Sequence, residues 1–126
     1  MLFTASMPNL YSRDVSVAAG FYRDLVGFSQ TYQYPPDGAP RHVELRLGSS
    51  LLAISSLDAV AEVGLPPTSD GHAHELVVWC DDIDAAIVRF RAAGAPILVE
   101  PHTHVAGHRR AYVGDPDGHW LALVQE

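Results

Sequence analysis

The sequence of 126 residues has one cysteine, few basic residues and no long apolar run. With Cys80 alone, an intrachain disulfide and a thiolate-rich zinc site are excluded, and we expect a cytoplasmic protein. Lys and Arg number 8 against 15 acidic residues, and the net charge of −7 argues against nucleic acid as a partner. No apolar stretch is long enough to predict a membrane span, and residues 1–9 do not resemble a signal peptide.

The remaining composition is typical of a globular domain. The hydrophobic fraction of 48% argues against disorder, and the length predicts one domain with a core of its own. The acidic surface favours a cationic small molecule as a partner, although solubility alone also accounts for such a charge.

The spacing of apolar residues predicts an α+β chain. Two helices are predicted, over residues 14–26 and 82–93; Asp14 or Ser16 begins the first, Asp82 or Asp84 begins the second, and Gly27 and Gly94 end them. The predicted strands cover residues 4–11, 28–34, 42–47, 50–56, 75–80 and 97–104, and Pro8 places the first of them at an edge or end. Residues 58–71 are predicted to be a connector that begins with a short helical turn.

Residues 109–124 are predicted to form a β-hairpin closed by the turn Asp115-Pro116-Asp117-Gly118. In the second arm of this hairpin, Trp120, Ala122 and Val124 alternate with Leu121 and Leu123, so both faces of the strand are apolar. A sheet with two apolar faces has to cover the second one, either with another layer or with a ligand cleft.

The order strand, helix and three strands occurs twice along the chain. Asp14-Val15 with Ala18 matches Asp82-Ile83 with Ala86 at a spacing of 68 positions, and the two glycines that end the helices are 67 positions apart. We therefore predict two tandem βαβββ modules, at about residues 1–57 and 72–126, in a single domain. The helices are expected on the outer face of a curved mixed sheet whose inner face encloses a cleft.

This organisation resembles the vicinal oxygen chelate superfamily, which includes glyoxalase I, extradiol dioxygenases, fosfomycin-resistance enzymes and bleomycin-resistance proteins. The resemblance covers essentially the whole chain and rests on three segments: Arg13-Asp14-Val15 through Gly27-Phe28, Asp82-Ile83 through Gly94, and Asp115-Pro116-Asp117-Gly118. It implies the fold, whereas the reaction stays open because the superfamily carries many functions on one scaffold.

Metal-dependent members of the superfamily hold a divalent ion with ligands from the first and last strands of each module, and the ion chelates two adjacent substrate oxygens. By this resemblance, the corresponding positions here are Met7, Glu75, Leu52 (or Ile54 in another register) and Ala122. Only Glu75 is a plausible ligand, because a divalent cation needs several oxygen or imidazole donors. We therefore expect no metal cofactor at the usual site.

Seven histidines leave a divalent metal at a non-standard site as an alternative. His72-Ala73-His74 and His102-Thr103-His104 each place two imidazoles on one side of a strand, a spacing that metals use. In a regular strand His74 points away from the face of Glu75, and exposed histidines near strand ends explain both pairs without a metal. The candidate ligands for this alternative are Glu75, His42, His74 and His104.

Glu75 itself has two interpretations. If it faces the cleft, it anchors a basic ligand group or acts as a general base, because an unpaired buried carboxylate is costly. In the other interpretation it forms a salt bridge with Arg46, Arg109 or Arg110, or lies half-exposed at a strand end. The sequence leaves both open.

Aromatic residues gather on the predicted inner face. Residues an even number of positions apart in a strand point to the same face, a rule that we call parity. By parity Tyr11, Trp79 and Trp120 share the faces of Met7, Glu75 and Ala122, respectively. Tyr32 shares a face with Tyr34, and Tyr112 lies on the adjoining hairpin arm. A pocket with aromatic walls typically holds a flat organic molecule, although any single ring is as well explained by the core or a dimer interface. The predicted ligand-binding residues are Met7, Tyr11, Tyr34, Leu52, Glu75, Trp79, Tyr112, Trp120 and Ala122.

No other catalytic pattern is recognisable: Ser55 and Ser56 lack a nucleophile-elbow context, and Cys80 is typical of a small buried hydrophobe. The leading hypothesis is a metal-free protein, similar to the bleomycin-resistance proteins, that binds an aromatic or cationic small molecule. In one version of this hypothesis the small molecule is an antibiotic, which the protein sequesters. The alternatives are a lyase, isomerase or dioxygenase with a divalent metal, or a metal-free enzyme that uses Glu75 as its base. The resemblance also implies a homodimer.

Overall fold

The computed structural model describes residues 2, 5–69, 74–104 and 106–126. The chain divides into two compact units, residues 1–69 and 70–126, here called module 1 and module 2. Three expected features lie outside the described residues: Thr4 at the start of the first predicted strand, residues 70–71 at the end of the predicted connector, and His72 of the first histidine pair. None of the helices in the described ranges has the length and apolarity needed to cross a membrane.

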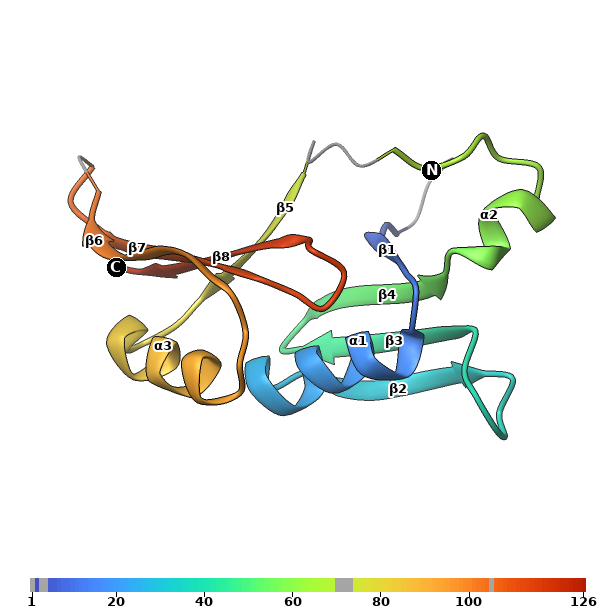
Figure 1. Cartoon of the computed structure of the whole chain (residues 1–126), viewed down its shortest axis with the longest axis horizontal. Coiled ribbons are helices and arrows are strands. Elements are labelled where there is room, and N and C mark those ends of the chain that lie inside the picture. The colour runs from blue at the N-terminus through green and yellow to red at the C-terminus, as the bar shows by residue number, and fades with distance from the viewer. Residues whose placement is uncertain (1, 3–4, 70–73, 105) are drawn as a thin grey trace. The chain divides into compact units, whose positions relative to one another are not determined.

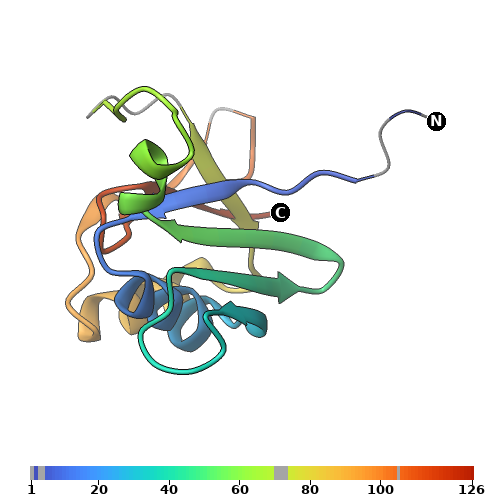
Figure 2. The ribbon, with the colours of Figure 1, turned by 90° about the vertical axis from the view of Figure 1, so that its right-hand side faces the viewer.

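Module 1 is a four-stranded mixed sheet with a helix on one face (Figure 1). Its strands lie in the order β1 (Asn9–Ser12), β4 (Ser50–Ser56), β3 (His42–Leu47) and β2 (Ser29–Tyr34). The neighbours β1 and β4, seen side by side in Figure 2, are parallel, and the other two pairs are antiparallel. Helix α1 (Val15–Phe21) packs on β3 and β4 and continues as the π-helical turn η1 (Tyr22–Val26).

Module 2 repeats this arrangement. Its strands lie in the order β5 (Glu75–Trp79), β8 (Trp120–Gln125), β7 (Arg109–Gly114) and β6 (Ile97–Thr103), and helix α3 (Ile83–Ala92) packs on β6, β7 and β8. Again the first strand is parallel to the last, and the remaining pairs are antiparallel. The predicted α+β class with two βαβββ modules is therefore confirmed, and each module builds its own four-stranded sheet.

Both helices begin at an aspartate, as the repeat predicts. The side chain of Asp14 accepts a hydrogen bond from the backbone N–H of Val17 at 3.2 Å, and that of Asp82 accepts one from Ala85 at 3.1 Å. These bonds satisfy N–H groups that have no partner within the helix. At the far end of η1, Gly27 has a φ of 105°, a left-handed conformation that glycine adopts without strain.

The face of each sheet that carries the helix forms the core of its module. Strand residues on this face alternate with those on the other face, as a period of two requires, and they are at most 2% exposed. In module 1 they are Val43, Leu45, Leu52 and Ile54, beneath Val15, Ala18 and Ala19 of α1. In module 2 they are Ala111, Val113, Leu121 and Leu123, beneath Ile83, Ile87 and Phe90 of α3.

Among the elements that the structure describes, the first strand departs most from its predicted bounds. β1 begins at Asn9, and Met7 lies in an irregular segment before it. Pro8 explains the difference because it has no N–H to donate to the ladder, and only its carbonyl is used, by the backbone N–H of Ala53 at 2.9 Å. The predicted edge position is confirmed, since β1 is the outermost strand of its sheet.

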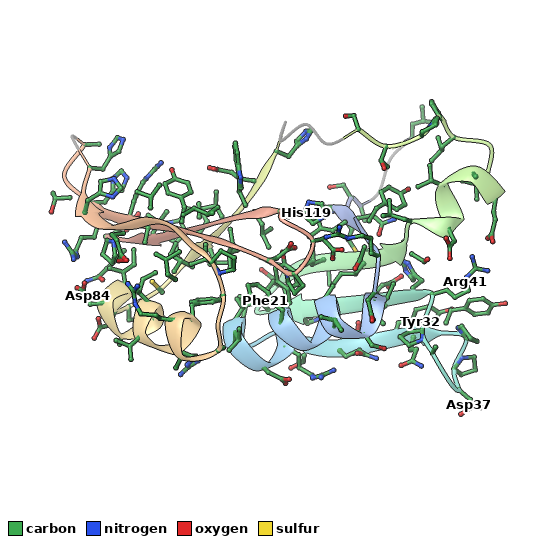
Figure 3. The ribbon with its side chains drawn as sticks, in the orientation of Figure 1. Phe21, Tyr32, Asp37, Arg41, Asp84 and His119 are labelled. Atoms are coloured by element: carbon green, nitrogen blue, oxygen red, sulfur yellow. The ribbon has the colours of Figure 1, made fainter. Side chains whose placement is uncertain are left out.

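The connector after β4 begins with helix α2 (Asp58–Glu62), as predicted. Arg41, which precedes β3, holds Glu62 of this helix with two hydrogen bonds of 2.7 and 2.8 Å, and Figure 3 shows Arg41 directed toward α2. The hydrogen bond and the charge of Glu62 raise the pKa of Arg41. This pair fastens α2 to the sheet of module 1.

Candidate functional sites on the open sheet faces

Each module has one sheet face that its helix does not cover, here called its open face. In module 1 the open face carries Asn9, Tyr11, Tyr32, Tyr34, His42, Glu44, Ala53 and Ser55, as the pairing register shows. In module 2 it carries Glu75, Val77, Trp79, Arg110, Tyr112, Trp120, Ala122 and Val124. Most of the predicted ligand-binding residues belong to these two sets.

The open face of module 1 holds a continuous hydrogen-bonded network of side chains. Nε2 of His42 lies 2.9 Å from Oε2 of Glu44, and Nδ1 of the same ring lies 2.7 Å from Oγ of Ser55. Oγ of Ser55 donates to Oδ1 of Asn9 at 3.0 Å. Three neighbouring strands, β3, β4 and β1, thus contribute to one polar network, which we call the relay.

Tyrosine rings border the relay. The ring of Tyr32 meets that of His42 edge-on with centroids 6.0 Å apart, and the register places Tyr34 opposite His42. Tyr11 lies opposite Ser55 on the other side. A substrate at the relay would therefore lie between aromatic walls.

The open face of module 2 is mainly apolar and aromatic. Residues that pair across its strands form three rows. The first row holds Glu75 and Trp120, the second Val77, Ala122 and Tyr112, and the third Trp79, Val124 and Arg110. Trp79 is 67% exposed and Trp120 38% exposed, whereas Ala122 between them is buried. The structure thus brings together Glu75, Trp79, Tyr112, Trp120 and Ala122, as the parity of the sequence predicts.

Arg110 supplies a positive charge at one end of this face. Its Nε donates to Nε2 of His108 at 2.7 Å, and its NH1 donates to the hydroxyl of Tyr112 at 3.2 Å. The rings of His104 and His108 stack with centroids 4.8 Å apart. Partial burial, the charge of Arg110 and the neighbouring rings of His108 and His102 lower the pKa of His104.

Glu75 forms no salt bridge with the described residues. It is exposed at the start of β5, opposite Trp120. Of its expected partners, Arg109 is paired with Asp84 at 2.7 Å, and Arg110 lies at the other end of the open face. The carboxylate of Glu75 is thus accessible to a ligand, as in the interpretation of an exposed strand end.

Two predicted site residues lie elsewhere. Leu52 is on the helix-covered face of module 1, where it is 1% exposed, and Ile54 shares this face. The assignment of Leu52 came from the resemblance to the superfamily, and a register that is off by one residue moves a strand side chain to the opposite face. Met7 precedes β1 and so has no place in the register of the sheet.

The side chains expected from the superfamily do not fit a divalent ion. Ala122 offers no donor, Leu52 is in the core, and only Glu75 carries suitable oxygens. In the part of the chain that the structure describes, no three His, Cys, Asp or Glu side chains form a group that could hold a metal ion.

The histidine alternative meets a further difficulty of distance. His104 directly follows β6, whose last residue pairs with Arg109 of β7, and Arg109 in turn pairs with Gln125 of β8. Glu75 pairs with Trp120, which lies five residues before Gln125 on β8. At about 3.3 Å per residue this is roughly 16 Å, whereas zinc–ligand bonds are about 2 Å long. Glu75 and His104 therefore cannot share one ion. His42 is engaged at both nitrogens by Ser55 and Glu44, and His74 is exposed just before β5.

Cys80 and a cavity in module 1 are not candidates for a functional site. Burial and the nearby charge of Asp81 raise the pKa of Cys80, which keeps the thiol protonated and unreactive. A shallow cavity of about 240 Å³ lies on the helix side of module 1, between Ser16, Ala19, Arg23, Gln30, Gln33 and Pro40. It contains none of the predicted site residues and is smaller than most ligand pockets.

Sequence reasoning gave no role to Ser55, Glu44 and Asn9. His42 and Glu44 lie on one strand, β3, but Ser55 and Asn9 come from the neighbouring strands β4 and β1. The one available signal was parity, which puts Asn9 on the face of Tyr11.

The fold and the sequence agree on a family. The model of the Glyoxalase/Bleomycin resistance protein/Dioxygenase superfamily matches residues 4–123, so the chain belongs to this superfamily. No curated protein matches the chain.

Solved structures with the same fold cover nearly all of the chain. A family enzyme from Burkholderia phytofirmans PsJN has 22% identity and a TM-score of 0.82, over 95% of this chain and 96% of that one. TioX from Micromonospora sp. ML1 has 24% identity and a TM-score of 0.75, over 97% and 98%. A lactoylglutathione lyase from Agrobacterium tumefaciens has 23% identity and a TM-score of 0.73, over 97% and 93%. At these identities the likeness shows the fold alone.

Proposed function

We propose that the protein binds a small, flat organic molecule on the open face of module 2. The observation that carries this proposal is the exposure of Trp79 and Trp120, 67% and 38%, on either side of Ala122. The side chain of Ala122 ends at Cβ, so it leaves a floor on which a planar molecule can lie between the two indoles. Exposed aromatic groups of this kind commonly mark ligand sites.

The polar groups at the two ends of this face orient the ligand. Glu75 lies in the first row and Arg110 four positions further along the strands, roughly 13 Å away at 3.3 Å per residue. A basic group on the ligand would lie at Glu75, in agreement with the acidic balance of the chain. The rings of Trp120 and Tyr112 would hold its aromatic part.

In this proposal the protein acts without a metal, as a binding protein similar to the bleomycin-resistance members of its superfamily. Its biological role would be sequestration, with an antibiotic as one ligand class. A homodimer is part of the proposal. Because Val77 is 36% and Trp79 67% exposed, a second copy could also cover the face.

The test is a screen of flat aromatic compounds in cationic, neutral and anionic versions, followed by calorimetric titration of those that bind. Trp79→Ala should weaken binding by about 10-fold or more, because a tryptophan that packs on a ligand is typically a major contributor. Glu75→Gln should weaken the binding of the cationic compounds and leave the binding of the neutral and anionic ones unchanged. The matched control is Val88→Ala, since Val88 is 68% exposed but lies on α3.

Three outcomes would contradict the proposal. If no planar compound binds the folded protein, or if Trp79→Ala and Val88→Ala bind equally well, the open face of module 2 is not the ligand site. If Trp79→Ala instead changes the mass measured by light scattering from dimer to monomer, this face is an interface between two copies.

A further inference from the structure

We propose that Ser55, His42 and Glu44 form a nucleophilic site on the open face of module 1, which transfers the acyl group of a small carboxylic ester to Ser55 and then to water. The inference concerns a different module from the proposed ligand site and does not depend on it. It rests on the relay, in which a hydroxyl, an imidazole and a carboxylate are joined in series by contacts of 2.7 and 2.9 Å.

Both contacts lie in the range that nucleophilic catalysis requires. An active serine needs a base within about 2.6–3.2 Å of its oxygen, and a third group that orients the base. His42 and Glu44 lie two residues apart on β3, and Ser55 lies opposite His42 on the paired strand β4. Since paired strands hold all three residues, the alignment is set by the sheet and not by a loop.

The carboxylate also determines which nitrogen of His42 acts as the base. An ionised Glu44 only accepts hydrogen bonds, so Nε2 of His42 must carry the hydrogen in their 2.9 Å contact. In the neutral ring Nδ1 is then unprotonated and accepts the hydroxyl hydrogen of Ser55. When the ring is charged, Nδ1 donates to Ser55 instead, and Ser55 donates to Asn9. Loss of one proton from the ring thus turns the hydroxyl from Asn9 to His42.

Asn9 supplies the remaining polar group. Its Oδ1 accepts from Ser55 at 3.0 Å, which places its amide close to the serine oxygen. The NH2 of this amide has no partner among the described residues, and asparagine amides stabilise the oxyanion in other acyl-transfer sites. Once the hydroxyl turns to His42, Asn9 is available to the carbonyl oxygen of an ester.

The proposed reaction balances with water as the only co-reactant. Oγ of Ser55 forms a bond to the ester carbonyl carbon while its proton moves to Nδ1 of His42. The tetrahedral intermediate expels the alkoxide, which takes this proton and leaves as an alcohol. Water then attacks the acyl-serine and gives a proton to Nδ1, and the carboxylic acid leaves as that proton returns to Ser55. Since Ser55 is only 6% exposed, we expect small acyl groups to be favoured.

Module 2 provides an internal comparison. His42 and Arg110, like the helix caps Asp14 and Asp82, are 68 positions apart, and they hold equivalent places in the two sheets. The place of Ser55 is held by Val124, which pairs with Arg110 as Ser55 pairs with His42. The arginine in the place of His42 is not a base and the valine in the place of Ser55 has no hydroxyl, so the reaction is expected in module 1 only.

The experiment uses p-nitrophenyl acetate with the full-length protein. Intact-mass and peptide mass spectrometry should find one acetyl group, on Ser55, and a fluorophosphonate probe should label the same residue. Ser55→Ala should abolish both modifications, while Ser56→Ala, the adjacent hydroxyl on the other face of β4, should keep them. Circular dichroism would check that each variant is folded.

Glu44 is a positioning residue, and its variant separates catalysis from a structural role. In Glu44→Gln the amide can donate to Nε2, which favours the hydrogen on Nδ1, so that the ring no longer accepts from Ser55. The maximum rate of labelling should fall by about 100-fold or more, as expected for a wrong tautomer, while the half-saturating probe concentration stays unchanged. His42→Gln should show the same loss.

The inference is overturned if the fluorophosphonate probe does not label Ser55 of the folded protein, or if the acetyl group is found on another residue. It is also overturned if Glu44→Gln and His42→Gln react at the rate of the unmodified protein. In these cases the relay only satisfies the polar groups of the open face.

Discussion

The two modules share their helix-covered faces and differ on their open faces. On the covered faces, the equivalent strand positions Leu52 and Leu121 are both leucine and both nearly inaccessible, and each helix begins at an aspartate. On the open faces, His42, Glu44 and Ser55 of module 1 correspond to Arg110, Tyr112 and Val124 of module 2. The repeat thus maintains the fold with one face of each sheet, and the other face is left to carry function.

One contact is repeated even on the open faces. In module 1 the ring of His42 bonds to the side chain two residues on, Glu44, and in module 2 Arg110 bonds to Tyr112, also two residues on. The geometry of the two pairs is alike because residues i and i+2 of a strand point to the same side. Their chemistry differs, since only module 1 combines a base with a carboxylate and a hydroxyl.

The largest effects should come from the covered faces, where the modules are alike. Leu52→Ala and Leu121→Ala should each lower the free energy of unfolding by about 2–5 kcal/mol, because both remove a fully buried side chain. The control is Leu51→Ala, which removes a leucine that is 37% exposed and should cost about 1 kcal/mol or less. Urea unfolding would measure all three, and a larger loss for Leu51 than for Leu52 would place Leu52 on the open face after all.

The helix caps should give intermediate and equal effects. Asp14→Ala and Asp82→Ala should each lower the free energy of unfolding by about 1 kcal/mol, because each leaves a helical N–H without its acceptor. Asparagine at either position should restore most of the loss. Asp37→Ala serves as control, since Asp37 points away from module 1 at the β2–β3 loop (Figure 3) and should change the stability little. A loss of stability for only one of the two variants would show that the helix caps of the two modules are not equivalent.

The smallest effect should be a pH dependence in module 2. The lowered pKa of His104 means that the unfolded chain, with a pKa of about 6.5, takes up this proton before the folded chain does. Stability contributed by neutral His104 is therefore complete above this value and is lost as the pH falls from about 6.5 toward the folded pKa. Urea unfolding at neutral and mildly acidic pH would measure how much the free energy of unfolding falls on acidification. This fall should be smaller for His104→Asn than for the unmodified protein, and an equal fall would contradict the assignment.

Much of the fold was predictable because its signals are local. Strands β3 and β4 have the predicted bounds, since alternating side chains and the Gly48 turn between them are properties of a few adjacent residues. The same holds for the helices that begin at Asp14 and Asp82. The start of β1 was wrong because the effect of Pro8 on the ladder depends on how its partner strand β4 is placed.

The sites were predictable only where parity within one strand decides the face. Glu75 and Trp79 share a face because they are an even number of residues apart, and the structure places them so. Leu52 was assigned from the superfamily's pattern of ligand strands and not from its own strand, and it lies on the opposite face. The relay could not be predicted, since His42, Ser55 and Asn9 meet only through the pairing of three strands.

The amino-acid sequence by itself thus determined the repeat, the elements, the helix caps and the apolar faces that the helices cover, because these follow from spacing along a single segment. The tertiary structure alone decided which side chains meet on the open faces. Strand register joins residues that are far apart in the chain, and a shift of one position would exchange every side chain between the two faces of a sheet. For this reason the relay at Ser55 appears only in the folded chain, whereas the aromatic face at Trp79 was already indicated by alternation within its strands.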